Sequence, residues 1–129
     1  MSSILDLCQA VPVTSFEPGA ILLAEGKKSG LLYVLVDGEV EILKGDFQIN
    51  VVSDKGAVFG EMSVLLNTPH TATVRARSAC HAHIVEDGDA FLKANPKIAY
   101  DLAKLLAKRL QGVTNYLTDL NRYVGLHLL

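Results

Sequence analysis

A succession of short β-favouring segments fills residues 13–85, and turn signals separate these segments about every ten residues. Pro18-Gly19, Asp37-Gly38 and Gly45-Asp46 are such signals, because proline presets φ and glycine accepts a positive φ. This spacing predicts a small antiparallel barrel or jelly roll. Strands are expected at 13–16, 20–24, 31–36, 39–43, 47–52, 58–59, 71–74 and 79–85.

Helices are expected at both ends of this β-region and once inside it. A short N-terminal helix over 4–10 would be capped by Ser3 and ended by Pro12, and residues 61–66 form a helix that Asn67-Thr68-Pro69 stops. After the strands, an Asp87-Gly88-Asp89 cap predicts a helix through Asn95, and a long helix follows over 97–123. The chain is therefore expected to be one domain that is mainly β with α. It comprises a helix at 1–12, a β-roll at 13–86 and C-terminal helices at 87–129.

Charge and hydropathy restrict the possible partners and location. The 129 residues include 12 basic and 14 acidic side chains, for a net charge of -2, which gives no electrostatic reason to bind nucleic acid or an anionic membrane. The sequence has no apolar run near the roughly 18 residues of a membrane span and no N-terminal signal pattern. A cytoplasmic protein is expected, with Cys8 and Cys80 reduced and buried.

The stretch over 58–76 has the layout of a phosphate-binding turn. Gly60 lets the backbone turn tightly after the Val58-Phe59 strand, and a short helix begins directly behind it. The first amides of a helix lack intrahelical partners, and the helix dipole is positive there, so an anion can bind. His70, Thr71 and Thr73 come where the chain returns past this helix.

The same stretch resembles the phosphate-binding cassette of the cyclic-nucleotide-binding domain family, and we call residues 58–74 the cassette. The resemblance rests on Phe59-Gly60-Glu61, Ser63, Leu65-Leu66, Pro69 and Thr71-Ala72, and on further landmarks in the family's order: Pro18-Gly19, Ile21, Glu25-Gly26, Leu32-Tyr33-Val34-Leu35, Gly38-Glu39-Val40 and Gly56. It implies an eight-stranded antiparallel jelly roll (double-stranded β-helix) with a short N-terminal helix, a cassette helix and a long C-terminal helix.

The resemblance also implies a ligand, cAMP or cGMP, and no cofactor. Glu61 would accept a hydrogen bond from the ribose 2′-hydroxyl, and the cyclic phosphate would lie on the amides of Gly60 to Ser63 with the Thr71 hydroxyl beside it. A threonine at this position leaves cGMP open as well as cAMP. The complete ligand-binding set is Phe59, Gly60, Glu61, Met62, Ser63, His70, Thr71, Ala72 and Thr114.

His70 stands where the family has its phosphate-binding arginine. Arginine supplies a permanent charge and a bidentate fork, whereas histidine offers one well-directed donor and is largely neutral above a pKa of about 6.5. One interpretation is a weakened, pH-dependent nucleotide site in which the bound phosphate raises the His70 pKa. The alternative is a degenerate domain that is an interaction scaffold or binds another small ligand.

The C-terminal helix carries an apolar seam with heptad spacing at Leu106, Leu110, Val113, Leu117, Leu120 and Val124. Such a seam predicts a homodimer, and the alternative is that the stripe is intramolecular core. Thr114 follows Arg109-Leu110-Gln111, which resembles the run in catabolite-activator-type proteins whose nearby hydroxyls reach the adenine. A solvated helix residue is the other interpretation of Thr114.

A competing class is a metal-dependent cupin enzyme, because a jelly roll with His81-Ala82-His83 suggests a metal pair. The cupin pattern needs a glycine where Arg75 stands and a third histidine on a later strand, so surface histidines without a metal are expected. No nucleophile–base set is visible, and we predict no enzyme. The sequence ends at Leu129 without a helix-turn-helix, kinase tether or channel segment, so a regulatory module is expected to act through an unknown effector protein.

Overall fold

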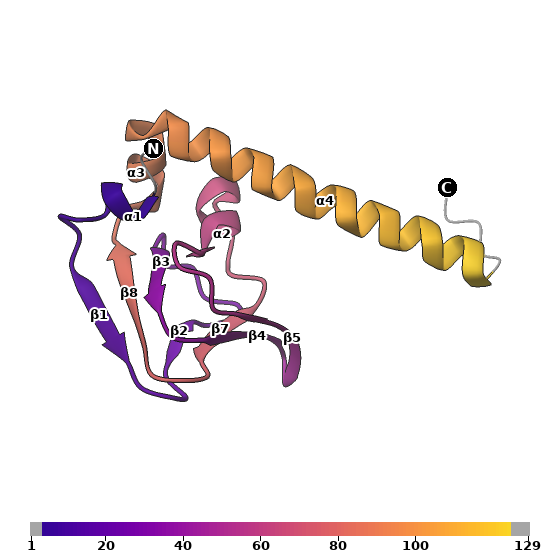
Figure 1. Cartoon of the computed structure of the whole chain (residues 1–129), viewed down its shortest axis with the longest axis horizontal. Coiled ribbons are helices and arrows are strands. Elements are labelled where there is room, and N and C mark those ends of the chain that lie inside the picture. The colour runs from indigo at the N-terminus through magenta and orange to yellow at the C-terminus, as the bar shows by residue number, and fades with distance from the viewer. Residues whose placement is uncertain (1–3, 125–129) are drawn as a thin grey trace. The chain divides into compact units, whose positions relative to one another are not determined.

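The computed structural model describes residues 4–124, so the predicted Ser3 cap lies outside the described residues. The chain divides into two compact units, Met1–Ala94 and Asn95–Leu129. The first unit contains the β-roll with three helices, and the second contains one long helix (Figure 1). The expectation that residues 1–129 form one domain stays a prediction.

Eight strands form two four-stranded sheets in the first unit. One sheet has the order β1-β8-β3-β6 and the other β2-β7-β4-β5, and every pairing is antiparallel (Figure 1). The predicted eight-stranded antiparallel jelly roll is confirmed. The strands are β1 (Val13–Phe16), β2 (Ile21–Leu23), β3 (Leu32–Asp37), β4 (Val40–Lys44), β5 (Phe47–Val52), β6 (Val58–Phe59), β7 (Thr73–Ala76) and β8 (Cys80–Val85).

The hydrophobic core lies between the two sheets, since strands of both contribute to one buried cluster. Side chains alternate in direction along a strand, so β7 directs Val74 and Ala76 inward while Thr73 and Arg75 stay partly exposed. Burying an aliphatic side chain of this size contributes about 1.5–3 kcal/mol. The cluster consists of Leu22, Leu23, Tyr33, Leu35, Val40, Phe59, Val74, Ala76, Cys80 and Ala82.

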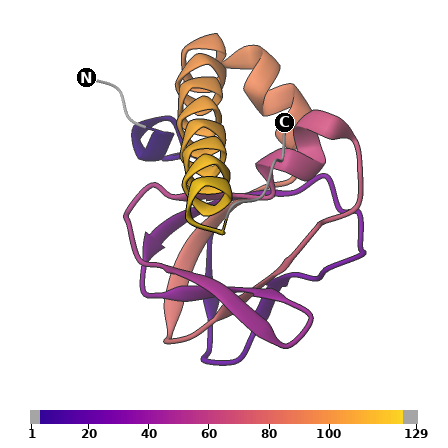
Figure 2. The same cartoon turned by 90° about the vertical axis from the view of Figure 1, so that its right-hand side faces the viewer.

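Three short helices accompany the roll: α1 (Ile4–Leu7), α2 (Glu61–Leu66) and α3 (Gly88–Ala94). Helices α2 and α3 lie next to one another (Figure 2). The predicted helix over 4–10 is wrong at its C-terminal end, because a tight turn closes by a hydrogen bond from the Val11 amide to the Cys8 carbonyl (2.8 Å). Pro12 disfavours helical geometry at Val11, which accounts for the early end.

At the cassette side of the roll, one strand is shorter than expected and another is shifted along the chain. The predicted strand over 20–24 is limited to β2, and the strand predicted over 71–74 starts only at Thr73. Thr71 and Ala72 lie in a bend, because the preceding His70 pairs its backbone with a loop instead of with a sheet neighbour. The two cysteines are free thiols and both are buried, as predicted.

The second unit is dominated by α4 (Pro96–Val124), which confirms the long C-terminal helix. Several large apolar residues of the predicted seam are exposed: Leu110, Val113, Leu117 and Leu120. Exposed apolar residues at heptad spacing agree with a helix that pairs with another helix. Within residues 4–124, none of the helices combines the length and the apolar character that crossing a membrane requires.

Candidate functional site

The cassette begins with a backbone turn at Gly60, the N-cap of α2. Gly60 has φ 90° and ψ 0°, a left-handed conformation that residues with a Cβ rarely adopt. A Cβ at this position would lie 2.5 Å from the carbonyl oxygen of Leu31. The turn is therefore open only to glycine, and it places the start of α2 directly against the end of the loop that joins β2 to β3, residues 24–31.

Helix α2 holds its two polar predicted residues in largely buried positions. The side chain of Glu61 is 8% exposed and that of Ser63 is 5% exposed. The Ser63 hydroxyl donates to the Thr68 carbonyl oxygen, and the Ser63 carbonyl accepts the amides of Asn67 and Thr68. The Ser63 side chain therefore closes the C-terminal end of α2, and what it can offer a ligand is its first-turn amide.

The other predicted residues of the first cassette half divide between core and surface. Phe59 is buried in the core cluster, where it fixes the end of β6. Met62 is exposed on α2. Phe59 therefore supports the turn from behind, and only the backbone of Met62 belongs to the amide run that follows Gly60.

His70 is buried at the far end of the cassette and is tied to the β2–β3 loop. Its backbone amide donates to the Lys27 carbonyl (2.8 Å), and its carbonyl accepts the Gly26 amide (2.8 Å). Its ring Nε2 lies 2.9 Å from the Ser29 Oγ, and the residue is only 6% exposed. Burial lowers the pKa of His70 below its ordinary value, because it disfavours the charged ring.

The bend after His70 is tied to the β4–β5 hairpin. The Lys44 ammonium donates to the Thr71 carbonyl oxygen (2.8 Å) and pairs with the Glu25 carboxylate (3.0 Å). The Glu25 amide in turn donates to the Thr73 hydroxyl (3.0 Å). Hydrogen bonds from the Gly45 amide and from Lys44 lower the pKa of Glu25. Thr71 is exposed and Ala72 is partly buried.

Both ends of the cassette thus meet the same three residues, 29–31. Gly60 abuts the Leu31 carbonyl, and the His70 ring contacts the Ser29 hydroxyl, which also accepts the Leu31 amide (3.3 Å). The sequence analysis did not select Ser29. A serine between two lysines and a glycine is typical of an exposed loop, and only the backbone pairing with His70 reveals its position.

A separate cavity of about 430 Å³ lies between α2, α3 and the β2–β3 loop. Its lining includes Ser63 but none of Gly60, Glu61, His70 or Thr71. The cavity therefore lies beside the predicted ribose–phosphate residues and does not coincide with them. It is lined by Lys28, Gly30, Ser63, Val64, Leu65, Asn67, Glu86, Asp87 and Asp89.

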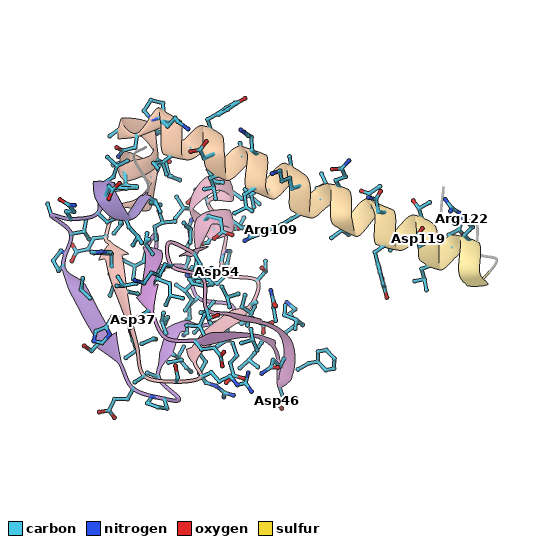
Figure 3. The ribbon with its side chains drawn as sticks, in the orientation of Figure 1. Asp37, Asp46, Asp54, Arg109, Asp119 and Arg122 are labelled. Carbon is cyan, nitrogen blue, oxygen red and sulfur yellow. The ribbon has the colours of Figure 1, made fainter. Side chains whose placement is uncertain are left out.

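Both histidines of the His81-Ala82-His83 pair use Nδ1 in a contact within the protein. Asp37 lies at the end of β3 (Figure 3). One of its carboxylate oxygens is 2.7 Å from the Nδ1 atom of His81. His83 donates from Nδ1 to the Val11 carbonyl (2.9 Å). In the described part of the chain, no three His, Cys, Asp or Glu side chains form a group that could hold a metal ion. The prediction of surface histidines is wrong for His83, which is buried where its ring meets the Val11 carbonyl of the segment after α1.

Thr114 belongs to α4 and therefore to the second unit. Its side chain is exposed, and its carbonyl accepts the Thr118 hydroxyl (2.9 Å). This local hydrogen bond does not involve the Thr114 hydroxyl. The role of Thr114 toward a ligand stays a prediction.

A comparison with models of protein families shows the family to which the chain belongs. A model described as the cyclic nucleotide-binding domain matches residues 13–93, which is more than half of the chain. The chain belongs to this family. The matched segment contains every strand of the roll, the whole cassette and most of α3.

Curated relatives of this cyclic-nucleotide-binding domain come from regulators and kinases. The CRP-like cAMP-activated global transcriptional regulator of Mycobacterium tuberculosis (strain ATCC 25618 / H37Rv) is 29% identical over 126 residues, which cover 92% of this chain and 56% of the regulator. The cGMP-dependent protein kinase of Plasmodium berghei (strain Anka) is 32% identical over 71 residues, 55% of this chain and 8% of the kinase. The chain thus spans about half of one relative and under a tenth of the other.

Solved structures share the fold. The Thermus thermophilus catabolite activator protein superposes with a TM-score of 0.77 at 24% identity, covering 91% of this chain and 58% of that one. A structure of Sp-2Cl-cAMPS bound to PKAR CBD2 superposes with a TM-score of 0.65 at 26% identity, covering 91% of this chain and 73% of that one. The jelly roll with its cassette helix is therefore the fold of the family.

Proposed function

We propose that this domain is a regulatory module that binds a cyclic nucleotide, cAMP or cGMP. The observation that carries the proposal is the convergence of both cassette ends, Gly60 and His70, on residues 29–31. A ligand phosphate placed at the Gly60 turn would meet first-turn amides of α2 on one side and the residues after Pro69 on the other. Membership of the family supports the same ligand class.

In this proposal each cassette residue contacts a different part of the ligand. The cyclic phosphate lies on the amides of Gly60 to Ser63, with the Thr71 hydroxyl and His70 beside it. The buried Glu61 carboxylate accepts the ribose 2′-hydroxyl, a contact that distinguishes a ribose from a bare phosphate. Ala72 leaves room at the bend, and Thr114 from α4 is proposed to reach the base.

The choice between cAMP and cGMP stays open in the proposal. The mycobacterial relative is described as cAMP-activated, and the plasmodial kinase is described as cGMP-dependent. Thr71 is compatible with either base. The titration described below therefore includes both nucleotides.

The output of the module is proposed to be a shift of the C-terminal helices that an effector protein detects. The module itself is proposed to be cytoplasmic and without enzymatic activity, and neither nucleic acid nor a membrane is its partner. The exposed seam of α4 supports a homodimer. Sedimentation equilibrium should give a dimer, and Leu117→Glu, which places a charge in the seam, should give a monomer. A monomeric wild-type chain would contradict the dimer.

A second candidate function rests on one observation, the burial of His70, which lowers the pKa of its ring. A site without a permanent cation at this position binds phosphate less strongly. If the loss is complete, the domain is a dimeric scaffold that uses the roll and α4 without a nucleotide.

Calorimetric titration with cAMP and cGMP at pH 6 and pH 8 separates the two candidates. The proposal predicts saturable binding of at least one of them, with 5′-AMP as the control that has the same base and ribose but an open phosphate. No heat and no thermal shift with millimolar ligand at both pH values would remove the nucleotide function and leave the scaffold.

A further inference from the structure

The bend over residues 70–73 is tied to the roll at more than one point. The Glu25 amide of the β2–β3 loop donates to the Thr73 Oγ1 atom (3.0 Å), where β7 begins. The Lys44 ammonium, at the end of β4, donates to the Thr71 carbonyl oxygen (2.8 Å). Two positions of the bend are therefore held by residues that lie far away in the sequence.

The register of the second sheet explains why a side chain makes the contact to Thr71. Strands β4 and β7 pair as far as Leu43 and Thr73, and the ladder ends there. Thr71 lies two residues outside the ladder, so its carbonyl oxygen accepts from the side chain of Lys44 and not from the backbone of β4. The contact takes the place of a ladder hydrogen bond where the chain enters the sheet.

Lys44 is itself held on a short hairpin. Gly45-Asp46 forms a two-residue turn between β4 and β5, and Gly45 has φ 59°, a positive value that glycine accommodates. The Glu25 carboxylate accepts the Gly45 amide (2.9 Å) with one oxygen and pairs with the Lys44 ammonium (3.0 Å) through the other. These two contacts lower the pKa of Glu25, so its carboxylate is ionised at neutral pH.

We propose that Lys44 is a positioning residue that holds the backbone of Thr71, so that the Thr71 hydroxyl meets the ligand phosphate without further ordering of the bend. This inference rests on the proposed function, and it gives the β4–β5 hairpin a part in nucleotide binding. Lys44 does not contact the ligand in this proposal. Its ammonium acts through the Thr71 carbonyl, and Glu25 holds the ammonium in place.

The exposure of Lys44 separates its effect on affinity from its effect on stability. Its side chain is 60% exposed, and exposed ion pairs contribute little to the free energy of unfolding. Lys44→Met should therefore leave the urea midpoint of unfolding unchanged. The released bend must then be ordered when the ligand binds, so Kd for the cyclic nucleotide should rise about fivefold. Lys44→Arg keeps a charged donor and should restore most of the affinity.

Arg77→Met is the matched control for the lost charge. Arg77 follows β7 and pairs with Glu39 (3.3 Å), and its side chain is 52% exposed, close to the exposure of Lys44. The control therefore removes one exposed cation from an ion pair beside the same sheet but leaves the Thr71 contact intact. It should leave Kd unchanged.

Calorimetry in a double-mutant cycle with Thr71→Ala tests the proposed route. The titrant is cAMP or cGMP, whichever the wild-type chain binds more tightly. Thr71→Ala removes the hydroxyl that Lys44 is proposed to position. Adding Lys44→Met to this variant should therefore change Kd less than about twofold.

Four outcomes would overturn the inference. An unchanged Kd in Lys44→Met refutes the role of Lys44 and keeps the proposed function. A full fivefold loss in the Thr71→Ala background refutes the route through Thr71, and an equal loss in Arg77→Met shows an effect of net charge alone. Absence of binding by the wild-type chain refutes the proposed function, and the inference with it.

Discussion

The two ends of the cassette are held in place by different kinds of interaction. At the first end, Gly60 is fixed by a backbone contact with Leu31, and Phe59 behind it is part of the core. At the second end, His70 and Thr71 are fixed by hydrogen bonds to Ser29 and Lys44, from a loop and a hairpin. Substitution of Gly60 should therefore act mainly through folding, whereas the largest effect of substituting His70 should be on ligand affinity.

The largest effect is expected from Gly60→Ala. The new Cβ would lie 2.5 Å from the Leu31 carbonyl oxygen, a backbone atom, and φ at this position is positive. Strain and displacement together should lower the free energy of unfolding by about 3 kcal/mol. Urea denaturation of the variant measures this loss.

Gly19→Ala is the control for Gly60→Ala, because Gly19 has the same φ of 90° and nothing lies within 4 Å of its Cβ position. Its free energy of unfolding should fall by only about 1 kcal/mol, the cost of placing alanine at a positive φ. Equal losses at the two glycines would mean that the contact with Leu31 does not hold the first cassette end.

Glu61→Gln should act on the ligand through the same end of the cassette. Replacing the carboxylate with an amide weakens the hydrogen bond to the ribose by about 2 kcal/mol, roughly thirtyfold in Kd. Calorimetry of the wild type and the variant, each with the cyclic nucleotide and with its 2′-deoxy analogue, isolates the energy of this one contact. The deoxy ligand should bind the variant and the wild type alike, and a full thirtyfold loss with the deoxy ligand would contradict the ribose contact.

His70→Arg should strengthen the second end. An arginine adds a permanent charge and two donors in place of one, which should tighten cyclic-nucleotide binding about tenfold. His81→Arg makes the same exchange on the exposed side of β8 and is the control for the added charge. Calorimetry that finds both variants equal to the wild type would show that residue 70 does not face the phosphate.

The smallest effect is expected from pH. Burial lowers the pKa of His70, so the unfolded chain binds this proton more readily than the folded one. His70 therefore costs no stability above about pH 6.5, and the free energy of unfolding falls as pH drops below that value, by at most about 1.4 kcal/mol per pH unit. The lowered pKa values of Glu25 and Glu41 affect stability only below their ordinary value of 4.5. The pH range in which these glutamates act is therefore separate from the range at about pH 6 in which His70 acts.

Urea denaturation at pH 7.5 and 5.5 measures this dependence. His70→Gln keeps a polar side chain that cannot titrate, and its free energy of unfolding should change less between these pH values. A wild-type chain with the same pH dependence as His70→Gln would mean that folding does not lower the pKa of His70.

The sequence predicted the roll because its information there is local. Turn signals such as Asp37-Gly38 and Gly45-Asp46 define where strands end: β3 ends at Asp37, and Gly45-Asp46 joins β4 to β5. The limits of the first cassette half were predicted for the same reason, since Gly60 and Asn67 mark the two ends of α2.

The missed features depend on residues that are far apart in the chain. The late start of β7 and the position of Ser29 both follow from the pairing of His70 with the β2–β3 loop, about 40 residues away. His83 is buried where its ring meets the Val11 carbonyl, 72 residues earlier in the chain. No local pattern near these residues contains that information.

The most direct test of the account is a map of backbone amide shifts on addition of cyclic nucleotide, measured by ¹⁵N–¹H NMR. A ligand that contacts both cassette ends should shift the amides of residues 60–63 and 70–72, and those of residues 29–31 between them. Shifts confined to one end, or confined to the cavity residues Gly30, Leu65 and Asp89, would contradict a ligand that joins the two ends.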